Sequence, residues 1–199
     1  MSWRTADVDL TDPTTVALLA AEGFEAAGHR YALYGGLLTA VYGEPRETRD
    51  ADLAVVDVSV AAAGAALNAL GVQASITFEN VRFGGLLVSR LTVIASGPST
   101  GLNTVDLVRP RSQRYAELAV RRAVVVPLRA TRVRLLSLED FILFKVLSTR
   151  ERDVEDARTA IRRSGDALDE HLLTREIAAL ELELPDVDVR GRWTATQSA

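Results

Sequence analysis

The chain has 199 residues, of which 48% are hydrophobic and 25% are charged, and its formal net charge is −4. This length suits one domain, or one domain with a small appendage, and the composition excludes both a disordered chain and a membrane-spanning one. The sequence contains no cysteine and only His29 and His171 as histidines, which excludes disulfides, thiol nucleophiles and metal sites built on thiolates or on several histidines.

The chain shows neither a secretory signal nor an apolar run near the ~18 residues that a membrane helix needs. We therefore expect a cytoplasmic protein with no membrane partner. The negative net charge argues against a protein coated in positive charge for nucleic acid, although it leaves room for one local basic face.

Up to about residue 135, the chain alternates between predicted helices and strands. Asp12-Pro13 is typical of a helix start, because an acidic cap residue precedes a proline at the first helical position. Apolar residues at helical spacing extend this helix towards Gly28. The pattern then predicts helices at 37–42, 61–70 and 112–122, loops at 44–49 and 96–103, and strands at 31–34, 51–58, 75–79, 86–95, 104–108, 124–128 and 133–135.

From Ser137 onward the sequence reads as all helix. The run from Ser137 to Asp140 is typical of a capping box, and the helix it starts should reach about residue 147. Further helices are predicted at 152–163 and 166–182, and a polar, poorly ordered tail after Pro185. The predicted organisation is a core over 1–135, a helical lobe over 136–184 and a tail over 185–199.

Two acidic residues, Asp50 and Asp52, stand two positions apart at the predicted strand 51–58. Alternate residues of a strand point to the same face of the sheet, so both carboxylates would lie together and repel each other. A divalent cation would relieve this repulsion. Hard cations such as Mg²⁺ choose oxygen ligands and leave positions open for phosphate.

A third acid, Asp106, interrupts the otherwise apolar strand 104–108. If that strand lies beside the one with Asp50 and Asp52, three carboxylates converge and can hold two metal ions about 4 Å apart, as in phosphoryl or nucleotidyl transfer. The alternatives are a solvated edge strand whose acids pair with Arg46 or Arg49 and, for Asp106, an acid bonded to a turn.

A glycine pair, Gly35-Gly36, ends the predicted strand 31–34 and opens a short helix. Missing Cβ atoms would let a triphosphate approach the backbone there, where N–H groups point at negative charge. An ordinary turn is the alternative, because turns often carry such a pair.

In combination, these residues resemble the signature of the nucleotidyltransferase superfamily with the polymerase-beta-like fold. That signature is a strand, Gly-Gly or Gly-Ser, a short helix, and then acid-x-acid flanked by apolar residues. Here it is Gly35-Gly36, thirteen intervening residues, and Asp50-Ala51-Asp52-Leu53. The resemblance covers about residues 30–163. It implies an α/β (α+β) fold, namely a mixed-sheet nucleotidyltransferase core with a C-terminal helical lobe.

The loop before the acids indicates a particular branch of this superfamily. Its form Arg46-x-Thr48-x-Asp50-x-Asp52 is similar to AbiEii-type toxins and related bacterial branches. Because Arg46, Thr48 and Arg49 lie in the loop that delivers the acids, we expect contacts from these side chains to the triphosphate.

The C-terminal helices carry a second motif. Lys145, followed by Arg152-Asp153 and Asp156, is similar to the family's helix lysine followed by Lys-Asp-x-x-Asp, with Arg152 at a position where lysine is frequent. Lys145 lies on an apolar helix face, so it must either extend outward to solvent or meet an anion such as a triphosphate or a carboxylate. Asp153 and Asp156 would support the site or pair structurally with Lys145, Arg150 or Arg152.

The resemblance implies Mg²⁺-dependent transfer of a nucleoside monophosphate from a nucleoside triphosphate to a hydroxyl acceptor, with Mn²⁺ as a substitute cation. Asp50 and Asp52 would hold the metals, and Asp106 would bind one metal and activate the acceptor. The acceptor varies in the family between RNA or tRNA, proteins and small molecules such as antibiotics. The toxin-like branch adds a cognate antitoxin as a partner in a toxin–antitoxin pair.

One observation bears on the acceptor, and one alternative to an enzyme stays open. The stretch 109–134 has eight arginines against the single acid Glu117 and would suit RNA phosphates, although a solvated face explains it equally well. A protein that keeps the fold but binds nucleotide or RNA without turnover is the main alternative to an enzyme.

Overall fold

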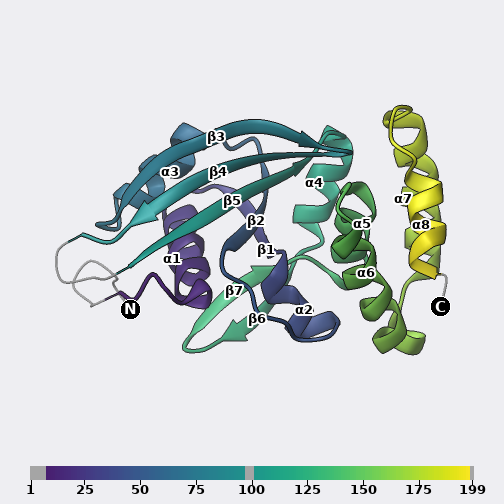
Figure 1. Cartoon of the computed structure of the whole chain (residues 1–199), viewed down its shortest axis with the longest axis horizontal. Coiled ribbons are helices and arrows are strands. Elements are labelled where there is room, and N and C mark those ends of the chain that lie inside the picture. Colours follow the sequence, from purple (N-terminus) through teal and green to yellow (C-terminus); the bar gives the residue numbers. More distant parts are fainter. Residues whose placement is uncertain (1–7, 97–100, 198–199) are drawn as a thin grey trace.

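The computed structural model describes residues 8–96 and 101–197, which form one mixed sheet with helices around it (Figure 1). The seven strands have the spatial order β3-β4-β5-β2-β1-β7-β6. Their bounds are β1 (Arg30–Tyr34), β2 (Ala51–Val56), β3 (Gln73–Phe83), β4 (Leu86–Ile94), β5 (Leu102–Pro110), β6 (Val124–Leu128) and β7 (Thr131–Leu135). The helices are α1 (Pro13–Ala26), α2 (Gly36–Tyr42), α3 (Val60–Asn68), α4 (Gln113–Arg121), α5 (Leu138–Leu147), α6 (Glu151–Ser164), α7 (Glu170–Glu183) and α8 (Val189–Gln197), with the 3-10 turn η2 (Gly165–Ala167) before α7.

The centre of the sheet brings together two strands that are far apart in the chain. β2 runs parallel to β5, with Asp52 directly opposite Asp106, and antiparallel to β1, with Asp52 opposite Tyr34. β2 is almost entirely buried, as expected for a run of apolar residues in a central strand. The β2–β5 pairing therefore places the two acids side by side.

Three helices cover one face of the sheet. α1 contacts β1, β2, β5 and β7, α3 contacts β3 and β4, and α4 contacts β1, β2 and β5. The predicted cap of α1 is confirmed, because the Asp12 carboxylate accepts hydrogen bonds from the backbone N–H groups of Thr14 and Thr15. The acids of β2 and β5 line one cavity together with Lys145 of α5.

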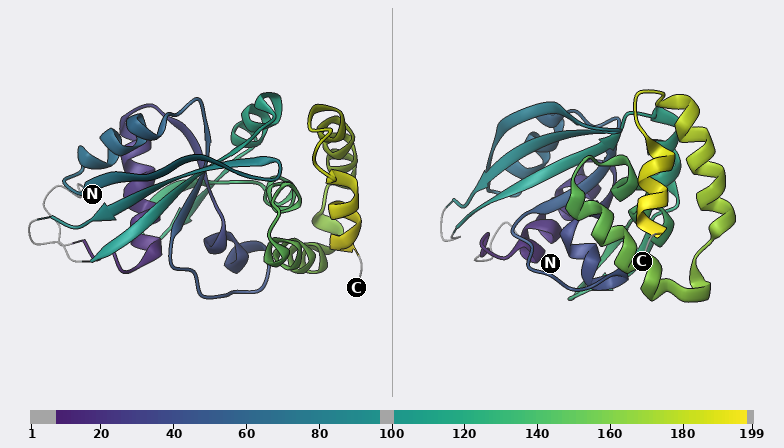
Figure 2. Two further views of the ribbon diagram at one scale, coloured as in Figure 1. Left: turned by 45° about the horizontal axis from the view of Figure 1, so that its top comes forward. Right: turned by 45° about the vertical axis from the view of Figure 1, so that its right-hand side comes forward.

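Helices α5 to α8 pack on one another at one end of the sheet. Figure 2 shows α7 and α8 side by side at the end of the molecule remote from α1. The predicted start of α5 is confirmed, because the Ser137 hydroxyl accepts the backbone N–H of Asp140. None of the helices over 8–96 and 101–197 is long and apolar enough to cross a membrane.

The predicted polar tail after residue 185 is wrong, because residues 189–197 form α8. The contacts that hold this helix in place cannot be predicted from its polar sequence. Val189 is buried, and the Arg192 guanidinium donates to the backbone carbonyl oxygens of Val146 and Arg150. The segment is therefore ordered by its packing on α5, α6 and α7.

The other predicted elements are present, with ends that differ by a few residues. The strand predicted at 75–79 is longer, and β3 follows β4 through two register shifts. Of the loop predicted at 96–103, positions 102 and 103 belong to β5, and 97–100 lie outside the described residues. The boundary after residue 135 stays a prediction.

Candidate active site

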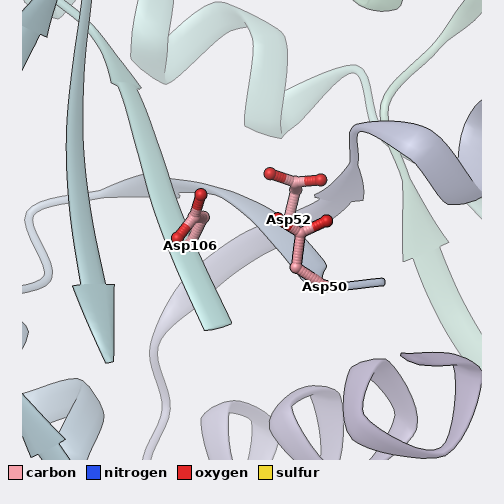
Figure 3. A group of neighbouring side chains, drawn as sticks. All are labelled: Asp50, Asp52 and Asp106. Carbon is pink, nitrogen blue, oxygen red and sulfur yellow. The ribbon is translucent and has the colours of Figure 1, made fainter. Parts of the chain in front are cut away.

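Three carboxylates meet at the centre of the sheet. Asp52 lies in β2, Asp106 lies in β5 directly opposite it, and Asp50 immediately precedes β2. One oxygen from each carboxylate lies within 4.8 Å of the others, and Figure 3 shows the three side chains gathered on one side of the sheet. The predicted convergence is confirmed. The interpretation of a solvated edge strand is wrong, because β2 lies inside the sheet between β5 and β1.

The three carboxylates lie close enough together to shift the pKa of Asp52. Burial, together with the negative charges of Asp50 and Asp106, raises the pKa of Asp52 from 3.8 to about 7, although Lys145 and Arg150 act against this shift. No hydrogen bond or ion pair reaches the Asp52 carboxylate from the described part of the chain. An oxygen-rich cluster of this kind suits a hard divalent cation, which would relieve the repulsion.

The glycine pair makes room for the acids. A Cβ atom on Gly35 would lie 1.8 Å from Asp52 Oδ2, and a Cβ on Gly36 would lie 2.5 Å from Thr48 Oγ1. Gly35 also has a φ of +74°, which side chains disfavour. The Thr48 hydroxyl lies 3.5 Å from Asp50 Oδ1. The missing Cβ atoms therefore leave room for the side chains of Asp52 and Thr48, and the expected approach of a triphosphate stays a prediction.

Arg90 completes the cluster, and the sequence analysis did not identify it. It lies in β4 opposite Asp106, and it donates to both Asp106 carboxylate oxygens at 2.6 and 2.7 Å and to Asp50 at 3.3 Å. The available signal was a charged residue within the apolar strand 86–95, the same signal that singled out Asp106.

Lys145 is buried rather than extended to solvent, at 3% exposed. Its Nζ donates to Asp153 at 2.6 Å and to Asp156 at 2.8 Å. Asp156 also accepts two hydrogen bonds from Arg46, at 3.1 and 3.2 Å. Burial raises the pKa of Asp156, but Lys145 and Arg46 outweigh it, and the pKa is lowered overall. The second motif is thus an ion network that ties α5, α6 and the loop before β2 together.

A cavity of about 220 Å³ opens above the carboxylates. Most of the predicted site residues line it: Gly35, Gly36, Arg46, Thr48, Asp50, Asp52, Asp106, Lys145, Arg152 and Asp153. Asp156 lies behind Lys145. Arg49 does not line this cavity. It lines a neighbouring hollow with Arg152, and its side chain is 85% exposed and lies 3.7 Å from Glu47.

The wall of this cavity that faces the acids is basic. Arg150 and Arg152 line the cavity from the start of α6, and neither side chain forms an ion pair within the described residues. The Arg150 guanidinium lies over the ring of Phe83, 4.8 Å from its centroid. Neither Arg150 nor Phe83 was among the predicted site residues. The cavity therefore has an anionic wall on the sheet and a cationic wall on the helical lobe.

The predicted basic stretch 109–134 is not a free basic surface. Most of its arginines pair with acids of the same molecule: Arg111 with Asp186, Arg114 with Glu176 and Glu183, Arg122 with Asp140 and Glu176, Arg129 with Asp12, and Arg134 with Glu25. These pairs favour the interpretation of a solvated, internally neutralised face.

The arrangement of sheet, carboxylates and helices is a nucleotidyltransferase-like fold. The structure resembles the crystal structure of an antigenic nucleotidyltransferase-like protein from Paracoccidioides brasiliensis, with a TM-score of 0.52 and 18% sequence identity over 96% of this chain and 95% of that chain. No protein-family model matches the sequence, and no curated protein matches it. At this identity the likeness establishes the fold.

Proposed function

We propose that this protein is a Mg²⁺-dependent nucleotidyltransferase, which moves a nucleoside monophosphate from a nucleoside triphosphate to a hydroxyl acceptor and releases pyrophosphate. The observation that carries the proposal is the convergence of Asp50, Asp52 and Asp106 in one cavity of a nucleotidyltransferase-like fold. The unrelieved charge at Asp52 supports a cation there.

In this proposal each acid has a role. Asp50 and Asp52 hold Mg²⁺, or Mn²⁺ in its place, in a two-metal site to which Asp106 contributes. Cations bound there would neutralise charge on the phosphoryl oxygens and would lower the pKa of an acceptor hydroxyl. Asp106, the most buried of the three acids, also accepts the proton of that hydroxyl.

The basic wall binds the triphosphate. Arg150 and Arg152 are cations without acidic partners among the described residues, so their charges are available to phosphate oxygens. Arg46 and Thr48 line the same cavity, and Asp156 of α6 orients Arg46. Lys145 acts indirectly, because its ammonium group is held by two acids of α6.

The acceptor is proposed only as a class, a hydroxyl group. The internal ion pairs of 109–134 take away the argument for RNA in particular. The likeness to AbiEii-type toxins rests on the loop motif before Asp52. This likeness supports an RNA, tRNA or protein acceptor and a cognate antitoxin, while the cytoplasmic setting is proposed from the sequence alone.

A label-transfer assay tests the proposal. The protein is incubated with Mg²⁺, each α-labelled nucleoside triphosphate in turn, and a mixture of total RNA, cell protein and small hydroxyl compounds including aminoglycosides. We expect transferred label and pyrophosphate with the wild type, and neither with Asp52→Ala. Asp57→Asn is the matched control, because Asp57 is an exposed acid outside the cavity that pairs with Arg30.

Unchanged turnover in Asp52→Ala would refute the mechanism. Nucleotide binding in a calorimeter without pyrophosphate release would instead support the binding-only alternative.

A further inference from the structure

Arg90 already occupies a cation position in the carboxylate cluster. Its guanidinium forms a two-pronged contact with Asp106, at 2.6 and 2.7 Å, and reaches Asp50 at 3.3 Å. The ring of Phe78 lies under the guanidinium, 5.6 Å from centroid to Cζ. Because β4 and β5 set Arg90 directly opposite Asp106, the contact is built into the sheet register. Such forked, charge-assisted hydrogen bonds are among the strongest in proteins.

Arg90 binds the three acids to different extents. Arg90 donates to both oxygens of Asp106, whose side chain is 3% exposed, so Arg90 competes with a metal ion for Asp106. Asp52, in contrast, has no hydrogen-bonding or ionic partner among the described residues, and Asp50 meets Arg90 only at 3.3 Å. The free protein thus offers one unblocked cation position, at Asp50 and Asp52.

We propose that Arg90 controls metal loading: the nucleotide-free protein binds one divalent cation, and Arg90 holds Asp106 back from a second. This inference rests on the proposed function, because it concerns the same cluster. The group that draws Arg90 away is a phosphate of the incoming nucleotide, since a guanidinium binds phosphate with the same fork that it offers to a carboxylate. Arg90 is then a positioning residue that acts through Asp106.

Counting Mn²⁺ ions on the nucleotide-free protein tests this proposal without an activity assay. Free Mn²⁺ is followed by electron paramagnetic resonance during titration of the wild type, Arg90→Gln and Arg109→Gln. Arg109 is the matched control, because it is a cation of β5 that lines a cavity away from the acids. We expect one tightly bound Mn²⁺ for the wild type and Arg109→Gln, and two for Arg90→Gln.

The affinity and the spectrum give two further readouts. Arg90→Gln should bind its second Mn²⁺ about 10- to 100-fold more tightly than the wild type does, the equivalent of losing one charge-assisted contact. Two ions about 4 Å apart should give a spin-coupled spectrum that one ion cannot give. Adding a non-hydrolysable nucleoside triphosphate analogue should produce the same spectrum in the wild type.

Arg90→Lys keeps the positive charge but cannot donate to both Asp106 oxygens in the same forked geometry. Its affinity for the second Mn²⁺ should therefore fall between those of the wild type and Arg90→Gln. Thermal melting checks that each variant is folded. If Arg90→Gln does not fold, Arg90→Lys takes its place in the comparison.

Two tightly bound ions in the wild type, or one ion in wild type and Arg90 variants alike, would overturn the proposal and leave the proposed function standing. No Mn²⁺ on any folded variant would overturn both.

Discussion

Gly35 leaves the space that the Asp52 carboxylate fills. The two residues meet because Asp52 pairs with Tyr34 across β1 and β2, so that the chain turns out of β1 directly beside the acid. Any Cβ at position 35 would lie 1.8 Å from Asp52 Oδ2, and the backbone there has a φ of +74°. The glycine and the acid, which are well separated in the sequence, therefore form one structural unit.

The first prediction concerns this unit. Gly35→Ala should abolish nucleotidyl transfer, because the new methyl group displaces Asp52, and should also cost about 1–3 kcal/mol through backbone strain. Label transfer and urea unfolding measure the two effects.

Gly28→Ala is the control for Gly35→Ala. Gly28 has a φ of +70° but nothing within 4 Å of an added Cβ, so this variant should lose comparable stability and keep its activity. Full activity in Gly35→Ala would show that Asp52 need not occupy its observed position.

The second prediction follows from the raised pKa of Asp52, which is about 7 against an ordinary value of 3.8. The folded protein holds this proton more tightly than the unfolded chain, so the stabilisation is complete below about pH 4 and is lost as the pH rises towards 7. Melting curves in a chelator should therefore fall over this range in the wild type relative to Asp52→Asn, which cannot ionise.

Each unit of pKa shift is worth about 1.4 kcal/mol, and each kcal/mol moves the melting temperature of a chain this long by about 2–4 °C. Mg²⁺ should reverse the wild-type loss at pH 8. Parallel pH profiles of the wild type and Asp52→Asn would contradict the raised pKa of Asp52.

The carboxylate cluster was predictable because its signals are local. Asp50 and Asp52 share a face by strand periodicity alone, and Asp106 stands out as an acid in an apolar strand. Their convergence needed only that β2 and β5 be neighbours, which the structure confirms.

Arg90 and α8 depend on information that no local pattern contains. Arg90 meets Asp106 only through the β4–β5 register, and β4 could not be aligned with β5 from the sequence. The helix α8 has few apolar residues, and contacts such as that of Arg192 with the Val146 carbonyl order it. Lys145 was left between two interpretations because its partners lie on a different helix.

The third prediction separates two arginines near the cavity. Arg152→Gln should raise the KM for the nucleoside triphosphate about 5- to 50-fold, as expected for the loss of one charge-assisted contact, with little change in melting temperature. Arg49→Gln should change neither, because that side chain points to solvent.

Initial rates over a range of nucleotide concentrations measure both KM values. A larger effect from Arg49 than from Arg152 would support the sequence-based prediction that Arg49 contacts the triphosphate.

The fourth prediction concerns the junction of core and helical lobe. Asp140 in α5 is fully buried and accepts hydrogen bonds from Arg122 at 2.6 and 2.9 Å and from the Tyr115 hydroxyl at 3.0 Å, so it ties α5 to α4. Asp140→Ala should lower the free energy of unfolding by about 3–5 kcal/mol, because it leaves the Arg122 charge without its closest partner. Urea unfolding measures this loss.

Glu139→Ala is the control. Glu139 stands one residue earlier, and its one side-chain hydrogen bond within the described residues is accepted from the Asp169 backbone N–H, so this variant should cost far less. Equal losses would mean that the first turn of α5, rather than the buried ion pair, holds the two parts together.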